Sequence, residues 1–251
     1  MAIQRIKMAE EVGDAPVVQR LWLVRHGTTQ WNQEQRFFGH SDVPLSAVGE
    51  VQARWLADAL SLAPITTIYS SDLVRASRTA EIIAGRQRHA VSLNISPLWR
   101  ELSFGLWEGL TYPYIAEHFK HDLGFFTDPF HYSPPGGEQF SLFVQRVQDA
   151  FLELVHAAKS GTGDIVLVSH AGVLRALLCY LLMVPFERQW QFRVDPGSLS
   201  ALDFVLSDEP VHDTVSLVTL NLHSSSLAVS VCQEEPSTTN QSSAEGSSQH
   251  V

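Results

Sequence analysis

The 251-residue chain is poor in cysteine, with only Cys179 and Cys232. Two cysteines do not make a disulfide framework, and Cys179 lies within the apolar run Leu-Leu-Cys-Tyr-Leu-Leu, which is typical of a buried thiol. Stable disulfides belong to oxidising compartments, so this cysteine usage favours the reduced cytosol. The first residues also lack the continuous apolar segment of a secretory signal, and we therefore expect a cytoplasmic protein.

Positive charge and long hydrophobic runs are scarce as well. The 17 Lys and Arg residues stand against 27 Asp and Glu residues, which gives a net charge of −10. Because nucleic acid and anionic membranes attract basic proteins, neither is an expected partner, and an anionic ligand would need a local cationic pocket. No apolar run reaches the ~18 residues of a membrane span. The longest, Val173–Val184, is interrupted by Arg175 and predicts a core helix.

The ends of the chain differ in composition from its middle. Residues 1–19 predict a flexible leader, and residues 224–251, rich in Ser, Thr and Gln without an aromatic residue, predict a disordered polar tail. Residues 20–223 then form one domain, which is long enough to bury a sizeable core.

Six short apolar segments bounded by turn residues predict β-strands, at 21–24, 65–69, 91–95, 165–168, 199–205 and 215–222. Two helical patterns are clear between them. The segment Ser46–Leu62 predicts a helix with one apolar face made by Val48, Val51, Trp55, Ala59 and Leu62. After Pro134-Pro135-Gly136-Gly137, a second helix is predicted with Ser141 as its N-cap and an apolar face of Phe140, Phe143, Val144, Val147, Phe151, Leu154, Val155 and Ala158.

This alternation of strands and helices predicts the fold class. Strands separated by helices pair in parallel, and right-handed crossovers place the helices on both faces of the sheet. We therefore expect an α/β, doubly wound fold with a mostly parallel sheet. The last two predicted strands have no helix between them, so one of them should be antiparallel.

Charged side chains follow four of the predicted strands, in the order Arg25 and His26, then Arg75, Glu101 and His170. Ligands of such sheets bind beyond the carboxyl ends of the strands, where the loops converge. If each of these residues were placed by chance, some should fall at the other edge of the sheet. We therefore expect them to lie close together.

These residue types suit phosphoryl transfer without a metal. A neutral imidazole is nucleophilic near pH 7, and arginine forks stabilise the charge on the phosphoryl oxygens. A carboxylic acid can protonate the leaving alkoxide, and a second histidine, if cationic, adds a donor. Taken singly, each residue has a blander reading: an ordinary hydrogen-bonded histidine, a surface ion pair or a solvated carboxylate. Their joint placement favours the site.

At this point the chain resembles the histidine phosphatase superfamily, which includes cofactor-dependent phosphoglycerate mutases and many small phosphatases. Six blocks carry the resemblance in the order of the family. They are Leu-Val-Arg-His-Gly-Thr-Thr-Gln-Trp-Asn at 23–32, Phe-Gly-His-Ser-Asp-Val-Pro-Leu-Ser at 38–46, Tyr-Ser-Ser-Asp-Leu-Val-Arg-Ala-Ser-Arg-Thr-Ala at 69–80, Arg-Glu-Leu-Ser-Phe-Gly-Leu-Trp-Glu-Gly at 100–109, Pro-Gly-Gly-Glu at 135–138 and Val-Ser-His-Ala-Gly-Val-Leu-Arg-Ala-Leu at 168–177.

The resemblance implies a phosphoglycerate mutase-like fold and a role for each site residue. His26 would be the phosphorylated nucleophile and Glu101 the proton donor, which later assists water. The remaining roles implied are phosphoryl binding by Arg25, Arg75, His170 and Asn32, with close backbone approach at Gly27. The chain departs from many relatives at Thr28, where they carry Glu; this position is outside the core set of site residues. Neither a metal nor a cofactor is expected.

The predicted lid, about residues 102–137, indicates which branch the chain resembles. A mutase must hold a carboxylate and a second phosphate, yet Lys120 is the single basic residue other than histidine from Leu102 to Gln145. The same stretch is aromatic, with Phe104, Trp107, Tyr112, Tyr114, Phe119, Phe125, Phe126, Phe130, Tyr132, Phe140 and Phe143. The spacing from Glu101 to His170 is also short for a mutase. These features favour hydrolysis of a small-molecule phosphomonoester.

Within the phosphatase branch the chain is most similar to the α-ribazole phosphatase type, which makes α-ribazole 5′-phosphate the candidate substrate. Aromatic lid residues could stack on its base, or they could simply pack the lid against the sheet. Phosphoserine and sugar phosphates remain open as substrates. The lid histidines His118, His121 and His131 complete no metal motif.

Two other functions compete with the phosphatase hypothesis. One is a 2,3-bisphosphoglycerate-dependent phosphoglycerate mutase, because the same blocks occur there. The other is a noncatalytic phosphate-binding module, which the presence of His26, Glu101 and His170 disfavours. A homodimer is left open by the sequence.

Overall fold

The computed structural model describes residues 18–158, 163–205 and 214–224. Residues 1–17 of the predicted leader and 225–251 of the predicted tail lie outside this range. Val18 and Gln19 belong to the first strand, so the leader boundary predicted at residue 19 is wrong by two residues. The polar Gln19 masks the strand pattern in the sequence, although in the structure its buried side-chain amide donates to the Gly163 carbonyl over 2.5 Å.

One six-stranded sheet forms the centre of the described chain, in the order β3-β2-β4-β1-β5-β6. Strands β1, β2, β3 and β4 pair in parallel, whereas β5 runs antiparallel to β1 and β6 antiparallel to β5. The strands are β1 (Val18–Arg25), β2 (Ile65–Ser71), β3 (Ser92–Ser96), β4 (Asp164–Ser169), β5 (Leu199–Val205) and β6 (Ser216–Leu222). The predicted fold class is confirmed. So is the prediction that one of the last two strands is antiparallel, and the structure shows that this strand is β5.

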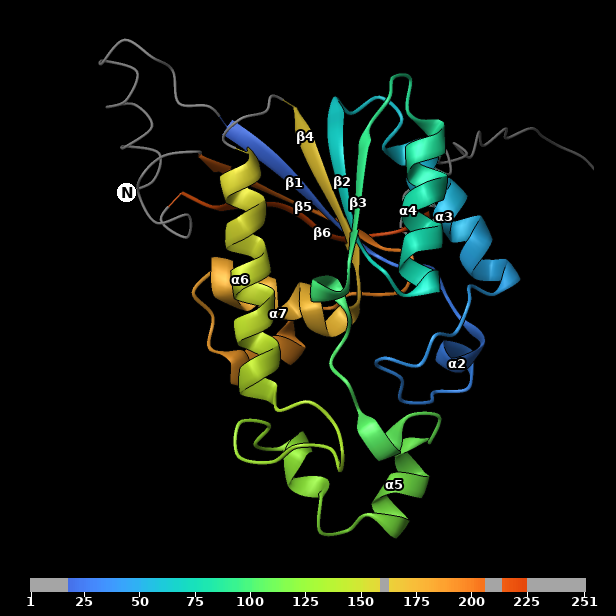
Figure 1. Cartoon of the computed structure of the whole chain (residues 1–251), viewed down its shortest axis with the longest axis vertical. Coiled ribbons are helices and arrows are strands. Elements are labelled where there is room, and N and C mark those ends of the chain that lie inside the picture. The colour runs from blue at the N-terminus through green and yellow to red at the C-terminus, as the bar shows by residue number, and fades with distance from the viewer. Residues whose placement is uncertain (1–17, 159–162, 206–213, 225–251) are drawn as a thin grey trace, which may run out of the picture.

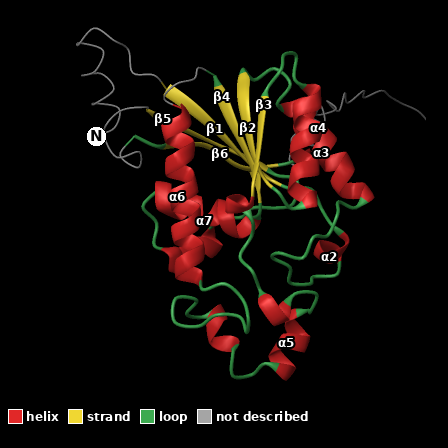
Figure 2. Ribbon diagram, in the orientation of Figure 1, coloured by secondary structure: helices red, strands yellow, loops and turns green. Residues whose placement is uncertain are grey.

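Helices cover both faces of the sheet (Figure 1, Figure 2). Helices α3 (Ala47–Ala59) and α4 (Val74–Arg86) pack on one face, and α6 (Phe140–Ala158) and α7 (Ala171–Leu181) on the other. Successive residues of β1 pack into two hydrophobic clusters, one on each face of the sheet. Leu23 faces the α6 and α7 side, and Val24 faces the α3 and α4 side. A strand buried on both faces must be apolar throughout, which explains the continuous run before Arg25.

The apolar face predicted for α3 is wrong. Val48, Val51 and Leu62 are exposed, and the buried positions are Gly49, Ala53, Leu56, Ala57 and Leu60. Small residues let this helix pack closely against α4 and against the segment after β1, where a Cβ on Gly49 would meet the Thr28 carbonyl oxygen at 2.1 Å. Large side chains such as Val48 and Val51 lie on the solvent face. Ser46 caps the start of this helix, because its hydroxyl accepts a hydrogen bond from Gly49 N.

The apolar face predicted for α6 is confirmed, with Phe140, Phe143, Val147, Phe151 and Leu154 buried. The predicted N-cap is wrong, because the helix already begins at Phe140 and Ser141 lies in its first turn. The Phe140 ring is buried and contacts Phe143, and this packing favours a helix that already includes Phe140.

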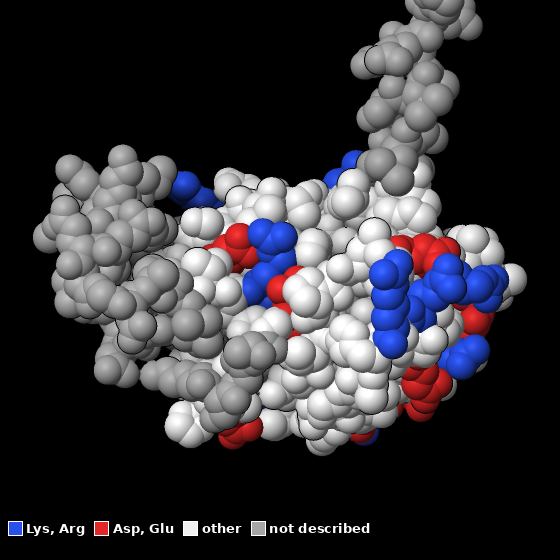
Figure 3. Space-filling view, turned by 90° about the horizontal axis from the view of Figure 1, so that it is seen from above, with Lys and Arg blue, Asp and Glu red and all other residues white. Residues whose placement is uncertain are grey.

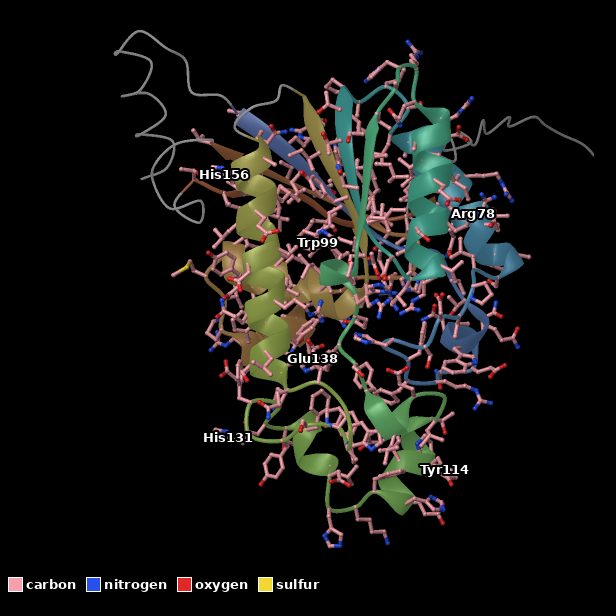
Figure 4. The ribbon with its side chains drawn as sticks, viewed as in Figure 1. Arg78, Trp99, Tyr114, His131, Glu138 and His156 are labelled. Atoms are coloured by element: carbon pink, nitrogen blue, oxygen red, sulfur yellow. The ribbon has the colours of Figure 1, made fainter. Side chains whose placement is uncertain are left out.

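The segment between β3 and α6 forms the lid beyond the carboxyl edge of the sheet (Figure 1). It contains α5 (Tyr112–His118) and short 3-10 turns, including Gly105–Trp107 and Leu123–Phe126. Its rings pack mainly on one another: the buried Trp107 stacks on Phe126 with centroids 5.2 Å apart and meets Phe125 edge to face. Tyr114 and His131 lie at the outer surface of the lid (Figure 4).

Opposite charges alternate over α3 and α4 (Figure 3). Arg78 pairs with Glu50, and Arg86 pairs with Asp58. Such exposed pairs contribute little stability. Among the described residues, the helices are too short or too polar to cross a bilayer.

Candidate active site

The two histidines predicted to share a site lie side by side. β1 and β4 are adjacent parallel strands whose last residues, Arg25 and Ser169, are in register. The residues that follow, His26 and His170, therefore leave the sheet together, and their ring centroids are 5.1 Å apart. A backbone hydrogen bond from His26 N to the Ser169 carbonyl, 3.0 Å long, extends the pairing by one step.

The His26 ring is held in one tautomer. Its Nδ1 lies 2.7 Å from the Gly27 carbonyl oxygen, which can only accept, so Nδ1 carries the proton and Nε2 keeps its lone pair. The side chain is 2% exposed. Burial, followed by the charges of Arg75 and Arg25, holds the pKa of His26 well below 6.5. The imidazole is thus a neutral nucleophile with a fixed orientation.

We expect His26 and His170 to stay neutral in the unliganded protein at about pH 6, where exposed histidines are largely protonated. Burial and the neighbouring arginines lower both pKa values, so the folded chain takes up these two protons only at more acidic pH. NMR of the chain with ¹⁵N-labelled histidine should show His26 protonated at Nδ1 and free at Nε2. The His26→Ala and His170→Ala spectra assign the signals. A titration midpoint at or above 6.5 for His26 would contradict the assignment.

Two arginines place positive charge beside the histidines. Arg75 is fully buried in the first turn of α4, and the partly buried Arg25 ends β1. Burial lowers the pKa of each guanidinium to about 10, and the nearby Glu101 carboxylate partly offsets this effect. Both side chains therefore remain cationic at neutral pH.

Several buried nitrogens at this point have no partner in the described part of the chain: Nε of Arg25, Nε of Arg75, and both ring nitrogens of His170. Buried polar atoms are nearly always hydrogen-bonded, so each unpaired group costs free energy unless a ligand satisfies it. Unpaired donors from two cations next to Nε2 of His26 fit the oxygens of a tetrahedral anion. This arrangement is the main structural argument for a phosphoryl site.

The Glu101 carboxylate lies at the N-terminus of α7. Its Oε2 accepts a 2.9 Å hydrogen bond from Gly172 N, and its Oε1 accepts one of the same length from Leu102 N. A Cβ at Gly172 would come within 2.2 Å of Glu101 Oε1, so a larger residue there would displace this carboxylate. The segment before Glu101 is fixed as well, because the carbonyl of Trp99 accepts from the Ser169 hydroxyl over 2.8 Å.

The remaining predicted site residues, Asn32 and Gly27, lie near the histidines but make different contacts. Asn32 lines the cavity described below, while its Oδ1 accepts from Thr29 N in the capping box of α2 (Gln30–Gln33). At Gly27, a Cβ would meet the Gly49 carbonyl oxygen at 2.4 Å. The structure thus gives Gly27 a packing requirement against α3 that the sequence analysis did not anticipate.

A cavity of about 220 Å³ opens from Arg25 and Glu101 toward the lid. Its walls are largely aromatic, with Phe37, Phe38, Phe104, Phe125, Phe126, Phe140, Phe143 and Trp190. Arg36 and Arg175 also line it, and neither was predicted as a site residue. Arg175 Nε donates to the Phe192 carbonyl, and its guanidinium lies 5.0 Å from the centre of the Trp190 ring.

Arg175 could have been found from the sequence. It interrupts the apolar run Val173–Val184 about one helical turn after His170, which places it near the same sheet edge. The lid histidines make contacts within the lid: His118 stacks on Tyr114, and His131 contacts Asp128. In the described residues, no three His, Cys, Asp or Glu side chains lie together as metal ligands would.

Known proteins share the sequence pattern and the fold of this chain. The family model of the histidine phosphatase superfamily (branch 1) matches residues 21–214. An adenosylcobalamin/alpha-ribazole phosphatase of Escherichia coli (strain K12) is 35% identical over 185 residues, which cover 73% of this chain and 89% of that protein. The protein of the same name from Salmonella typhimurium is 37% identical over 186 residues, covering 73% and 90%.

Other relatives carry different names, and solved structures share the fold. A probable phosphoglycerate mutase of Salmonella choleraesuis is 35% identical over 191 residues, covering 74% of this chain and 85% of that protein. The crystal structure of a putative alpha-ribazole-5′-P phosphatase from Escherichia coli superimposes with a TM-score of 0.72 at 32% identity, covering 81% of this chain and 96% of that one. The chain therefore belongs to the histidine phosphatase superfamily (branch 1).

Proposed function

We propose that this chain is a metal-independent phosphomonoesterase that works through a phosphohistidine at His26. The observation that carries the proposal is the neutral, buried His26 imidazole, with Nε2 free, beside the unpaired donors of Arg25, Arg75 and His170. Membership of the family and the names of the relatives support it.

The reaction needs two displacements at phosphorus. Nε2 of His26 forms a bond to phosphorus while the ester P–O bond breaks. The leaving alkoxide takes a proton from Glu101, which enters this step as the carboxylic acid and leaves it as the carboxylate. Water then attacks the phosphohistidine, gives a proton to the Glu101 carboxylate and breaks the P–N bond. Inorganic phosphate leaves, and both side chains return to their starting forms. Throughout, Arg25 and Arg75 stabilise the charge on the phosphoryl oxygens.

His170 supports the reaction through its two unpaired ring nitrogens. Without a ligand its pKa is held well below 6.5, first by burial and then by the charge of Arg75. A bound dianion removes part of that electrostatic penalty, so phosphate binding favours the protonated ring. His170 would then donate a charge-assisted hydrogen bond to a phosphoryl oxygen.

We further propose that the leaving group carries a planar apolar part, as α-ribazole 5′-phosphate does. The aromatic wall of the cavity supports this choice, together with the names of the relatives. Trp190 also lines the cavity, and its side chain is 66% exposed. It lies outside the lid, which contains the aromatic residues predicted as candidates for stacking.

α-Ribazole 5′-phosphate should therefore be hydrolysed with a kcat/KM about 10- to 100-fold above that of ribose 5-phosphate, because stacking of one base contributes roughly 1–3 kcal/mol. The measurement is phosphate release from both substrates by the same enzyme preparation. Ribose 5-phosphate is the matched control, since it keeps the sugar and the phosphate. Equal kcat/KM values for the two substrates would reject the proposed leaving group, but they would not contradict the proposed phosphatase activity.

The mutase hypothesis has one observation in its favour, because Arg36 and Arg175 add positive charge to the cavity from outside the lid. Arg36 is already paired with Glu34, so Arg175 is the cation that a substrate carboxylate could use. Incubation with 3-phosphoglycerate and 2,3-bisphosphoglycerate distinguishes the two activities. Hydrolysis predicts phosphate release; formation of 2-phosphoglycerate that depends on the bisphosphate would establish the mutase.

A further inference from the structure

We propose that Glu108 is a positioning residue that sets the geometry of Arg75 in the phosphoryl site. The inference rests on the phosphatase function proposed above. Glu108 belongs to the lid and does not line the cavity, so it acts through other residues. Its effect passes through the strap, defined as residues Gly39–Asp42, which lies between Glu108 and Arg75.

The strap holds Arg75 by its backbone. Arg75 Nη1 donates to the Ser41 carbonyl over 2.9 Å, and Nη2 donates to the Gly39 carbonyl over 2.7 Å. Two of the three guanidinium nitrogens are thereby fixed, which leaves the buried Nε without a partner in the described chain. Asp42 adds a further link, because its Oδ1 accepts from Val74 N at the start of α4, where Leu73 provides no side-chain cap.

Glu108 holds the strap from the other side. Its Oε1 accepts from His40 N at 2.9 Å and from Phe104 N at 3.1 Å. Its Oε2 accepts from Ser41 N at 2.6 Å and from the Ser41 hydroxyl. Burial opposes ionisation of Glu108, but these hydrogen bonds outweigh it and lower its pKa. The carboxylate is thus a charged anchor whose two oxygens serve four donors.

The same strap also reaches the predicted proton donor. The His40 ring nitrogen Nε2 lies 3.0 Å from the Glu101 carbonyl oxygen and donates to it. Packing leaves the strap little room, since a Cβ on Gly39 would come within 1.9 Å of the Leu102 carbonyl oxygen. A change at Glu108 is therefore transmitted to Arg75 directly and to the backbone of Glu101 more weakly.

A purely structural role in holding the lid can be separated from positioning, because the lid has a second half-buried carboxylate anchor. Glu138 accepts from Arg146 Nε at 3.0 Å and from Nη2 at 2.9 Å, where the lid meets α6 (Figure 4). It also accepts from Ser103 N at 3.4 Å, but it makes no hydrogen bond to the strap. Glu138→Gln is thus the matched control for Glu108→Gln.

The experiment measures inhibition by inorganic phosphate and the steady-state constants with p-nitrophenyl phosphate, for the full chain and four variants. The variants are Glu108→Gln, Glu138→Gln, Arg75→Ala and the double change of Glu108→Gln with Arg75→Ala. Glutamine keeps the shape of Glu108 but offers one acceptor oxygen where the strap requires two. We expect Glu108→Gln to raise the inhibition constant of phosphate about 10-fold, from lost hydrogen bonds to a charged group. Glu138→Gln should change it less than about 2-fold.

The double variant tests whether Glu108 acts through Arg75. In the Arg75→Ala background, Glu108→Gln should change phosphate inhibition less than about 2-fold, since coupled residues are not additive. An undiminished effect there, or equal losses for the Glu108 and Glu138 variants, would overturn the proposal. If Glu108→Gln fails to fold, Ser41→Ala removes one bond to the anchor and should weaken phosphate binding about 2- to 3-fold. An unchanged Ser41→Ala would then reject the role.

Failure of the proposed function would look different. In that case the unaltered chain would release no phosphate from any monoester. Binding of inorganic phosphate, measured by isothermal titration calorimetry, would still report on the geometry of Arg75. Loss of binding in Glu108→Gln but not in Glu138→Gln would support the positioning role even then.

Discussion

Replacing His26 with alanine should lower kcat for phosphate release by about 10⁴-fold or more, because loss of a covalent nucleophile removes the chemical route itself. Arg25, Arg75 and His170 would still bind the phosphoryl group, so KM should change much less than kcat. The measurement is steady-state hydrolysis of p-nitrophenyl phosphate by the variant and the unaltered chain.

The fold should survive this change, because His26 follows the last residue of β1 and packs outside the two main hydrophobic clusters. Far-UV circular dichroism and thermal unfolding check that point. His156→Ala is the matched control, since this histidine is exposed on α6 (Figure 4) and should leave kcat unchanged. Substantial activity in a folded His26→Ala protein would remove His26 as the nucleophile.

Replacing Glu101 with glutamine should have the second-largest effect, and its size should depend on the leaving group. For alkyl phosphates we expect kcat to fall about 10²- to 10⁴-fold, the usual contribution of general acid catalysis. For p-nitrophenyl phosphate the first step should be almost unaffected, since p-nitrophenolate leaves without a proton. The measurement compares single-turnover rates for glycerol phosphate and p-nitrophenyl phosphate.

Glutamine preserves much of the local geometry around residue 101. Its Oε1 can still accept from one of the two backbone donors, Gly172 N or Leu102 N. A loss that is equal for both substrates would therefore contradict proton donation by Glu101 and point instead to a structural role. Phosphate binding by the variant, measured separately, shows whether the phosphoryl site remains intact.

The sequence was sufficient for the sheet and for bringing the charged residues to one edge. The strand Asp164–Ser169 is buried along almost its whole length, so its apolar run is unambiguous. The position of a residue just after such a strand then determines where it lies in a doubly wound sheet. The same reasoning predicts that His26 and His170 lie close together, and their ring centroids are 5.1 Å apart.

Helix faces were less predictable where small residues make the contact. In α3, Gly49, Ala53 and Ala57 are buried, whereas the larger Val48 and Val51 are exposed. A pattern that weights side-chain size selects the wrong face there, because close packing against the sheet excludes large side chains. The same reasoning explains Gly27, whose requirement comes from the Gly49 backbone.

The residues that support the site were missed for a further reason. Glu108 contacts Ser41, 67 positions earlier in the chain, and Arg146 contacts Leu98, 48 positions earlier. Nothing in the local sequence around either residue indicates such a partner. These roles depend on tertiary structure, whereas the positions of Arg25 and Glu101 follow from the ends of predicted strands.

The proposed mechanism requires a covalent bond between phosphorus and His26. Rapid quenching of the enzyme with ³²P-labelled α-ribazole 5′-phosphate or p-nitrophenyl phosphate tests it most directly. We predict an acid-labile, base-stable adduct that appears in the first turnover, maps to the peptide containing His26 and is absent from His26→Ala. Phosphate release without such an adduct, or an adduct on another residue, would contradict the mechanism.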